Sequence, residues 1–262
     1  MCAVPPFILW LVLAAGGLAA AAEPGIAPTG TLRAAYIVSN LAQAVKDPAT
    51  GEFRGVSADL VRELGRRNQV PVTILPLATA AAVLEAVQQG QADIGFVAPN
   101  PERMGAALYS QPYMLVQQTF LVRDNSPLTS VRELDRPGRK IGANAGDSVA
   151  LYLKTHFRQA TVAESPDYTL QEGATWLADG AVDAFAGNRQ RLRVSTQGMP
   201  GLRLLADNLY GVPQAIAVAN EKPGLATALN GAIDDLRASG FLRAAVERSG
   251  VDGIEVAPPV KP

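Results

Sequence analysis

The sequence predicts an α/β fold, because short strand-like runs alternate with helical patterns along the chain. Several of these runs are too apolar to have a solvated face, which is typical of central parallel strands covered by helices. A third observation is a pattern that occurs twice in the sequence. The segments QQGQADIGFV near residue 90 and LADGAVDAFAG near residue 180 both read as helix, glycine, aspartate and apolar strand. Two similar sheets are therefore expected.

Eight strands are expected, at 31–38, 72–77, 92–98, 118–123, 139–144, 182–187, 202–206 and 214–220. Five helices are expected, at 57–68, 79–89, 147–157, 169–179 and 223–247. Capping boxes are predicted where Ser130 precedes Glu133 and where Thr169 precedes Glu172. Gly90 and Gly180 are expected to cap the C-terminal ends of helices.

Composition limits the classes of function. The 262 residues are 48% hydrophobic, which is enough to build a sizeable core. The 23 Lys and Arg residues are balanced by 24 Asp and Glu residues, and no basic block stands out. Because nucleic-acid binders need a concentrated positive surface, no nucleic-acid partner is expected.

The first 22 residues contain no charged side chain and predict a signal peptide. Ala20 and Ala22 give the A-x-A pattern of a cleavage site, which places the mature start near Glu23. The apolar run from Phe7 to Ala22 is shorter than the roughly 20 residues that span a bilayer. The sequence thus predicts a periplasmic protein that is soluble after cleavage.

Cysteine and histidine are nearly absent. Cys2 lies inside the predicted signal peptide, and His156 is the single histidine of the chain. A mature chain without cysteine cannot form disulfides, thiolate nucleophiles or cysteine metal sites. Neither a metal nor a cofactor is expected.

Six motifs occur in order along the chain: GTLRAAY, GEFRGVSADLVREL, QGQADIGFVAPNPERMGAALYSQPY, SVRELDRPGRKIGANAGDS, LYGVPQAIAVA and LRASGFLRAAVERSG. Together, from about Gly30 to Gly250, they resemble the extracytoplasmic solute-binding proteins of ABC importers, family 3, the branch that includes polar amino-acid binders. The chain is similar to a divergent member of that family.

This resemblance implies a two-lobed, type II periplasmic-binding-protein-like fold with ligand clamped between the lobes. Lobe 1 would comprise residues 23–117 and 214–262, and lobe 2 residues 118–213. Two strands would form the hinge, with the chain leaving lobe 1 near Met114–Gln117 and returning near Gly211–Gln214.

Ligands of open parallel sheets bind beyond the carboxyl ends of the strands, where helix N-termini gather. Asn100 and Pro101 predict such a helix start, and they place Arg103 in its first turn. An arginine fork matches a carboxylate at two points. The family resemblance also implies that Arg103 is the carboxylate anchor, although a solvent-exposed arginine is the alternative.

Two strand ends in lobe 2 carry polar residues. The turn at Gly146, Asp147 and Ser148 could bind a polar group of the ligand, or Asp147 could serve as a helix N-cap. Asn188 and Arg189 follow the strand at 182–187. The family usually has an aspartate where Asn188 stands, and that aspartate pairs with the ligand's ammonium group. Asn188 could bind ligand without that charge or could cap a helix.

Lobe 1 departs from the family pattern. The first loop has Asn40 where the family carries an aromatic residue, and a second aromatic wall is replaced near Thr79. Tyr36 and Phe96 are candidate replacements that could shape the pocket with Asn40, but buried aromatics more often pack in a core. The resemblance therefore leaves open whether the ligand is an ordinary amino acid.

Two enzyme hypotheses compete with binding. The segment GDSVA around Ser148 approaches a nucleophile elbow, but His156 lies eight residues further along the same predicted helix, too far to serve as its base. A lyase or dehydratase on the same fold would use Asp147 as an acid. A ligand-sensing receptor for a signalling partner is a third class.

The sequence as a whole predicts a monomeric, non-enzymatic receptor. It would bind a small carboxylate-bearing solute, an amino acid or related organic acid, with Arg103, Asn188, Arg189, Asp147, Ser148, Tyr36, Asn40 and Phe96 around it. It would deliver that solute to the permease subunits of an ABC importer by hinge closure.

Overall fold

The computed structural model describes residues 25–166 and 170–260. The predicted signal peptide, with its cleavage site, and the capping residue Thr169 lie outside these described residues. Within them, no helix combines the length and the apolar composition needed to cross a bilayer.

The first half of the sheet contains three parallel strands in the order β4-β1-β5. These strands are β1 (Leu32–Ile37), β4 (Val72–Leu77) and β5 (Ile94–Val97). The helices of this half are α1 (Val56–Arg67), α2 (Ala80–Gln88), α6 (Pro223–Ala238), α7 (Phe241–Ser249) and the 3-10 turn η1 (Pro101–Arg103). Three short strands, β2 (Val45–Lys46), β3 (Phe53–Arg54) and β6 (Leu108–Tyr109), complete it.

The second half repeats this plan with parallel strands in the order β10-β8-β9. The strands are β8 (Lys140–Asn144), β9 (Thr161–Ser165), β10 (Ala184–Asn188) and the short β11 (Leu202–Leu204). The helices are α3 (Ser148–His156), α4 (Leu170–Ala178), α5 (Arg189–Thr196) and the 3-10 turn η2 (Val131–Glu133). The capping box of Ser130 and Glu133 is confirmed at η2.

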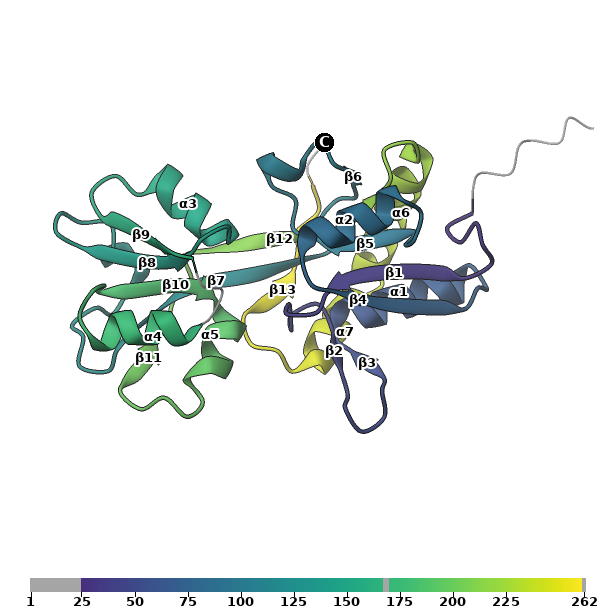
Figure 1. Cartoon of the computed structure of the whole chain (residues 1–262). Helices are drawn as coiled ribbons and strands as arrows, with labels where there is room; N and C mark the ends of the chain where they lie inside the picture. The colour runs from purple at the N-terminus through teal and green to yellow at the C-terminus, as the bar shows by residue number, and fades with distance from the viewer. Residues whose placement is uncertain (1–24, 167–169, 261–262) are drawn as a thin grey trace, which may run out of the picture.

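Two long strands, β7 (Met114–Arg123) and β12 (Tyr210–Val218), join the halves and pair antiparallel with each other. Their register runs from Met114 opposite Gln214 to Gln118 opposite Tyr210. β12 continues against β5 in the first half, and β7 continues against β10 in the second. A third strand, β13 (Ile254–Val256), pairs with β7. Figure 1 shows the resulting two-lobed molecule, and the predicted α/β class is confirmed.

Alternation along β1 divides the core of the first half into two layers. Leu32, Ala34 and Tyr36 face a cluster formed with α1, α6 and α7, whereas Ala35 faces the other side, against α2. A strand presents successive side chains to opposite faces, so a strand that is apolar throughout must be covered on both. This is why the apolar runs predicted a sheet between helices.

The second half is layered in the same way around Phe120 and Phe185. Phe120 lies in the cluster that includes α3, while Phe185 lies with α4 and α5 on the opposite face. Gly173 makes room for the Phe185 ring, because a Cβ at this glycine would lie 2.8 Å from it.

The sequence pattern that repeats near residues 90 and 180 has the same structural role in both halves. Gly90 and Gly180 follow α2 and α4 with φ angles of +68° and +70°, a conformation that glycine adopts without strain. In the first half, Asp93 accepts hydrogen bonds from the backbone N–H of Arg33 at 2.9 Å and from its guanidinium at 2.8 and 3.0 Å. In the second, Asp183 accepts from the backbone N–H of Lys140 at 2.9 Å.

Some expected elements differ from the observed ones. The helix expected over 223–247 is two helices, because Gly240 adopts a left-handed φ of +77° between them. β9 and α5 have no expected counterpart, and neither do the short strands β2, β3, β6 and β13. β9 is an edge strand whose burial does not alternate, and α5 is largely polar, so neither has a strong apolar period.

We predict that Asp93→Ala lowers the free energy of unfolding by about 3 kcal/mol, because the fully buried carboxylate is the partner of Arg33. The same change at Asp183, whose side chain is 30% exposed, should cost only about 1 kcal/mol. Urea unfolding of both variants measures the difference. Equal costs would show that burial does not distinguish the two carboxylates.

Candidate functional site

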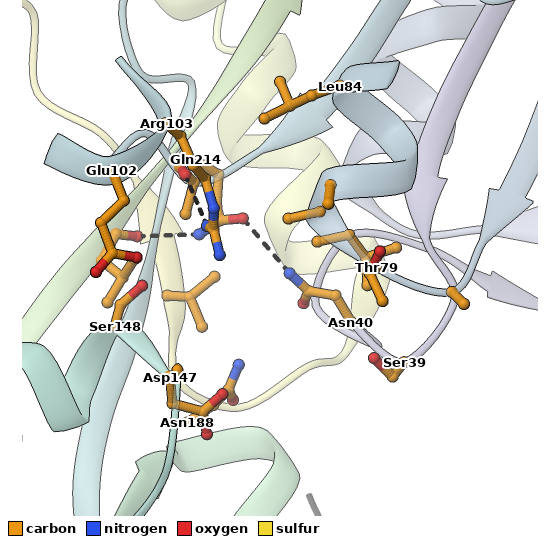
Figure 2. Close-up of a pocket in the computed structure, with 18 of the residues that line it drawn as sticks. Ser39, Asn40, Thr79, Leu84, Glu102, Arg103, Asp147, Ser148, Asn188 and Gln214 are labelled. Carbon is orange, nitrogen blue, oxygen red and sulfur yellow. Dashed lines mark hydrogen bonds between the residues drawn. The ribbon is translucent and has the colours of Figure 1, made fainter. Parts of the chain in front are cut away.

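A pocket of about 1050 Å³ lies between the two halves of the molecule. Its walls come from strand ends and helix starts of both halves, and its floor comes from the paired strands β7 and β12. The polar lining residues are Ser39, Asn40, Thr79, Glu85, Gln88, Glu102, Arg103, Gln118, Asp147, Ser148, Asn188, Gln190, Arg191, Gln214 and Asn220. Figure 2 shows Arg103 and Asn40 on one side of this space, with Asp147 and Asn188 across from them. None of the described lining residues is aromatic.

Arg103 reaches the pocket from η1. Asn100 caps this turn by accepting the backbone N–H of Arg103 at 2.9 Å, and Pro101 occupies its first position. Arg103 donates through Nη1 to the carbonyl oxygen of Ala98 at 3.2 Å. This bond fixes one edge of the guanidinium while the group lines the pocket. Such a partly anchored fork is suited to a planar oxyanion.

The turn before α3 places Asp147 and Ser148 in the opposite wall. Asp147 occupies the N-cap position, but its side chain makes no capping hydrogen bond. One carboxylate oxygen instead accepts from Nδ2 of Asn144 and from Nη1 of Arg191, both at 3.4 Å. Asp147 thus holds the predicted N-cap position without capping the helix through its side chain, and the residue lines the pocket.

Burial sets the protonation chemistry of Asp147. Desolvation raises the pKa of this carboxyl, and the charges of Arg191 and Arg103 together with the Asn144 hydrogen bond oppose that rise. Of these opposing effects the charge of Arg103, from the other wall of the pocket, is the smallest.

Asn188 ends β10 and caps α5, because its side-chain oxygen accepts the backbone N–H of Arg191 at 3.2 Å. The capping alternative is confirmed here. Because an amide oxygen has two lone pairs, Asn188 can still accept a further hydrogen bond as well as donate through its N–H groups, but it carries no charge. This geometry does not reproduce the aspartate that pairs with an ammonium group.

Arg189 does not line the pocket, and the prediction that it borders the ligand is wrong. Its side chain is 9% exposed and donates to Asn208 at 2.6 Å and to the carbonyl oxygens of residues 205–207. Gly253 packs against its aliphatic part, where a Cβ would lie 2.8 Å from Arg189 carbons. The arginine that reaches the pocket is Arg191, two residues further along α5.

Tyr36 and Phe96 also lie away from the pocket. Both are 2% exposed and belong to the core beneath α1. Tyr36 packs edge-to-face on Phe53 with ring centroids 5.6 Å apart, and Phe96 packs on Tyr113 at 5.7 Å. Their strand positions alternate toward the core, so they cannot replace the missing aromatic walls.

Asn40 lines the pocket, and it is supported by residues that the sequence did not single out. Its Nδ2 lies 3.4 Å from Oε1 of Gln214, which also accepts from Nε2 of Gln43 at 2.9 Å. Gln43 and Gln214 are buried, at 0% and 3% exposure. A glutamine at the start of the apolar run QAIAVAN was the available signal.

The described residues contain no cluster of three or more His, Cys, Asp or Glu side chains that could hold a metal. Ser148 and His156 stand at opposite ends of α3, which spans about 12 Å between them. His156 Nδ1 lies 2.8 Å from Oγ1 of Thr155. The geometry thus supports the exclusion of a Ser–His pair.

A family model of bacterial extracellular solute-binding proteins, family 3, matches residues 39–250. The chain belongs to this family. Among characterised relatives, the glutamine-binding protein of Geobacillus stearothermophilus is 24% identical over 184 residues, which cover 68% of each chain. The family resemblance drawn from the ordered motifs is confirmed.

Solved structures agree on the fold. A putative ABC-transporter binding component from Wolinella succinogenes, complexed with lysine, matches with a TM-score of 0.66 at 22% identity, covering 84% of this chain and 95% of that one. The periplasmic VFT2 domain of BvgS from Bordetella pertussis matches with a TM-score of 0.68 at 20% identity, covering 85% and 94%. At these identities the likeness establishes the two-lobed type II fold.

We predict that Asp147→Asn stabilises the folded protein at neutral pH. The folded-state pKa of Asp147 is raised above its ordinary value of 3.8, which means that the folded protein binds the proton of this carboxyl more tightly than the unfolded chain does. The stability that the bound proton contributes is present below pH 3.8 and is lost as pH rises through the folded-state pKa. The variant should therefore have the higher melting temperature at pH 7 and match the wild type near about pH 3.5.

Thermal unfolding across this pH range tests the prediction, with Asp179→Asn as the control because Asp179 is an exposed carboxylate. A variant less stable than the wild type at pH 7 would mean that the Arg191 contact outweighs desolvation.

Proposed function

We propose that this protein is the solute-binding component of an ABC importer and binds a small carboxylate-bearing solute, an amino acid or a related organic acid, between its lobes. Family membership supports a solute-binding role. The pocket supports binding of a small polar solute between the lobes, because it lies between two separately packed halves and is lined by polar groups from both.

The observation that carries the carboxylate assignment is the placement of Arg103. Several described arginines have their donors used by protein groups; two examples are Arg33, which pairs with Asp93, and Arg189, which donates to Asn208 and three carbonyl oxygens. Arg103 has a single side-chain hydrogen bond to a described residue, Ala98. It is thus held in the wall of the pocket with donors left for a ligand.

Binding requires the second wall to approach the first. Ser148 and Asn188 line the pocket from lobe 2, and both can hydrogen-bond a polar solute that Arg103 already holds. Each lobe keeps its own core, so rotation about β7 and β12 can close the pocket without disrupting packing. The closed form is the state that permease subunits would recognise, and delivery in the periplasm follows from that role.

We predict that Arg103→Ala weakens binding of a carboxylate solute by about 30- to 5,000-fold, equivalent to about 2–5 kcal/mol. The affinity of Arg103→Lys should lie between those of the wild type and Arg103→Ala, since lysine keeps the charge but not the planar fork. Isothermal titration calorimetry with amino acids, dicarboxylates and aromatic acids measures the dissociation constants.

Arg243→Ala is the matched control, because Arg243 is exposed on α7 and does not line the pocket. An unchanged affinity in Arg103→Ala would refute the anchor. Chemical conversion of the bound solute, followed by mass spectrometry, would instead favour the lyase alternative with Asp147 as its acid.

A further inference from the structure

Three amide side chains form a buried hydrogen-bonded chain that ends at the pocket. Gln43 lies in the turn that follows β1, Gln214 lies on the connecting strand β12, and Asn40 lies in the pocket wall. Gln43 donates through Nε2 to Oε1 of Gln214 at 2.9 Å and to the carbonyl oxygen of Phe96 at 3.2 Å. The dashed line from Gln214 to Asn40 in Figure 2 is the last link.

A backbone group determines which atoms of these three amides donate and which accept. The N–H of Ile37 can only donate, and it lies 3.3 Å from Oε1 of Gln43. The amide nitrogen of Gln43 must therefore donate onward to Gln214. Because Oε1 of Gln214 is an acceptor, Asn40 must present its own Nδ2 to it. The orientation of the Asn40 amide thus follows from which of its neighbours donate and which accept, and its Oδ1 is left as an acceptor.

This Oδ1 is buried and has no hydrogen-bond donor among the described residues. A buried acceptor without a donor is costly, and a ligand that supplies one recovers that cost. Asn40 lines the same pocket as Arg103, and in Figure 2 both side chains border one space. A solute anchored by its carboxylate at Arg103 can therefore extend toward Asn40.

We propose that Asn40 is a specificity-determining residue whose Oδ1 accepts a hydrogen bond from an uncharged N–H or O–H group of the bound solute. This inference rests on the proposed carboxylate-binding function and narrows its ligand. The class is a carboxylate that also carries a carboxamide or hydroxyl group.

Other ligand classes fit this wall less well. An apolar end would leave Oδ1 of Asn40 without a donor. An aromatic ring would find no ring to stack on among the described lining residues. A cationic end would exchange its hydration for a neutral acceptor backed by two further neutral amides. A neutral donor matches the single acceptor without such a cost.

The test uses pairs of probes that differ by one donor: L-glutamine against L-glutamate 5-methyl ester, and L-homoserine against O-methyl-L-homoserine. Calorimetric titration of the wild type should show the donor-bearing member binding about 5- to 150-fold more tightly in at least one pair. In Asn40→Leu this preference should fall below about twofold. Asn40→Ala provides a second variant that cannot overpack the site.

Asn125→Leu is the control, because it makes the same chemical change at an exposed turn outside the pocket. It should keep the wild-type preference. A preference that survives in both Asn40 variants, or methylated probes that bind as tightly as their partners, would overturn the role of Asn40 while leaving Arg103-dependent binding intact. If neither these probes nor any other carboxylate binds, the proposed function fails as well.

Discussion

The antiparallel ladder between β7 and β12 is the constraint on which the rest of the structure depends. Five residue pairs, from Met114 opposite Gln214 to Gln118 opposite Tyr210, hold together two halves that otherwise pack around separate cores. The same strands supply Val116, Gln118, Val212 and Gln214 to the pocket floor. Connection and binding surface are therefore one element, and any rotation between the halves must alter the distance between the two pocket walls.

The fold was predictable from sequence because its strands are apolar on both faces and its helices have clear ends. The repeated pattern around Asp93 and Asp183 indicated two related halves, and the structure gives it a cause: in each half the carboxylate accepts the backbone N–H of the first parallel strand. The unpredicted α5 shows the limit of this reasoning. It follows Asn188 with the polar run RQRLRVST, in which Leu192 is fully buried, so periodicity gives little signal there.

The site was predictable only in part. Arg103 and Asn188 were identifiable because local signals, a cap and a first turn, fix where they lie. Arg189 and Arg191 could not be told apart without the phase of α5. They are two positions apart, about 200° around a helix, so one turns to the protein interior and the other to the pocket. The amide chain from Gln43 joins residues 171 positions apart and has no local signature.

The lack of aromatic residues in the pocket lining determines which methods can detect ligand binding. Trp176, the tryptophan within the described chain, packs against Phe185 in the second half with ring centroids 6.3 Å apart, and it does not border the pocket. Its intrinsic fluorescence would therefore report on rearrangement inside that half rather than on contact with solute. An optical titration that relies on quenching by the ligand itself would be silent even at saturation, so occupancy has to be followed by heat or mass.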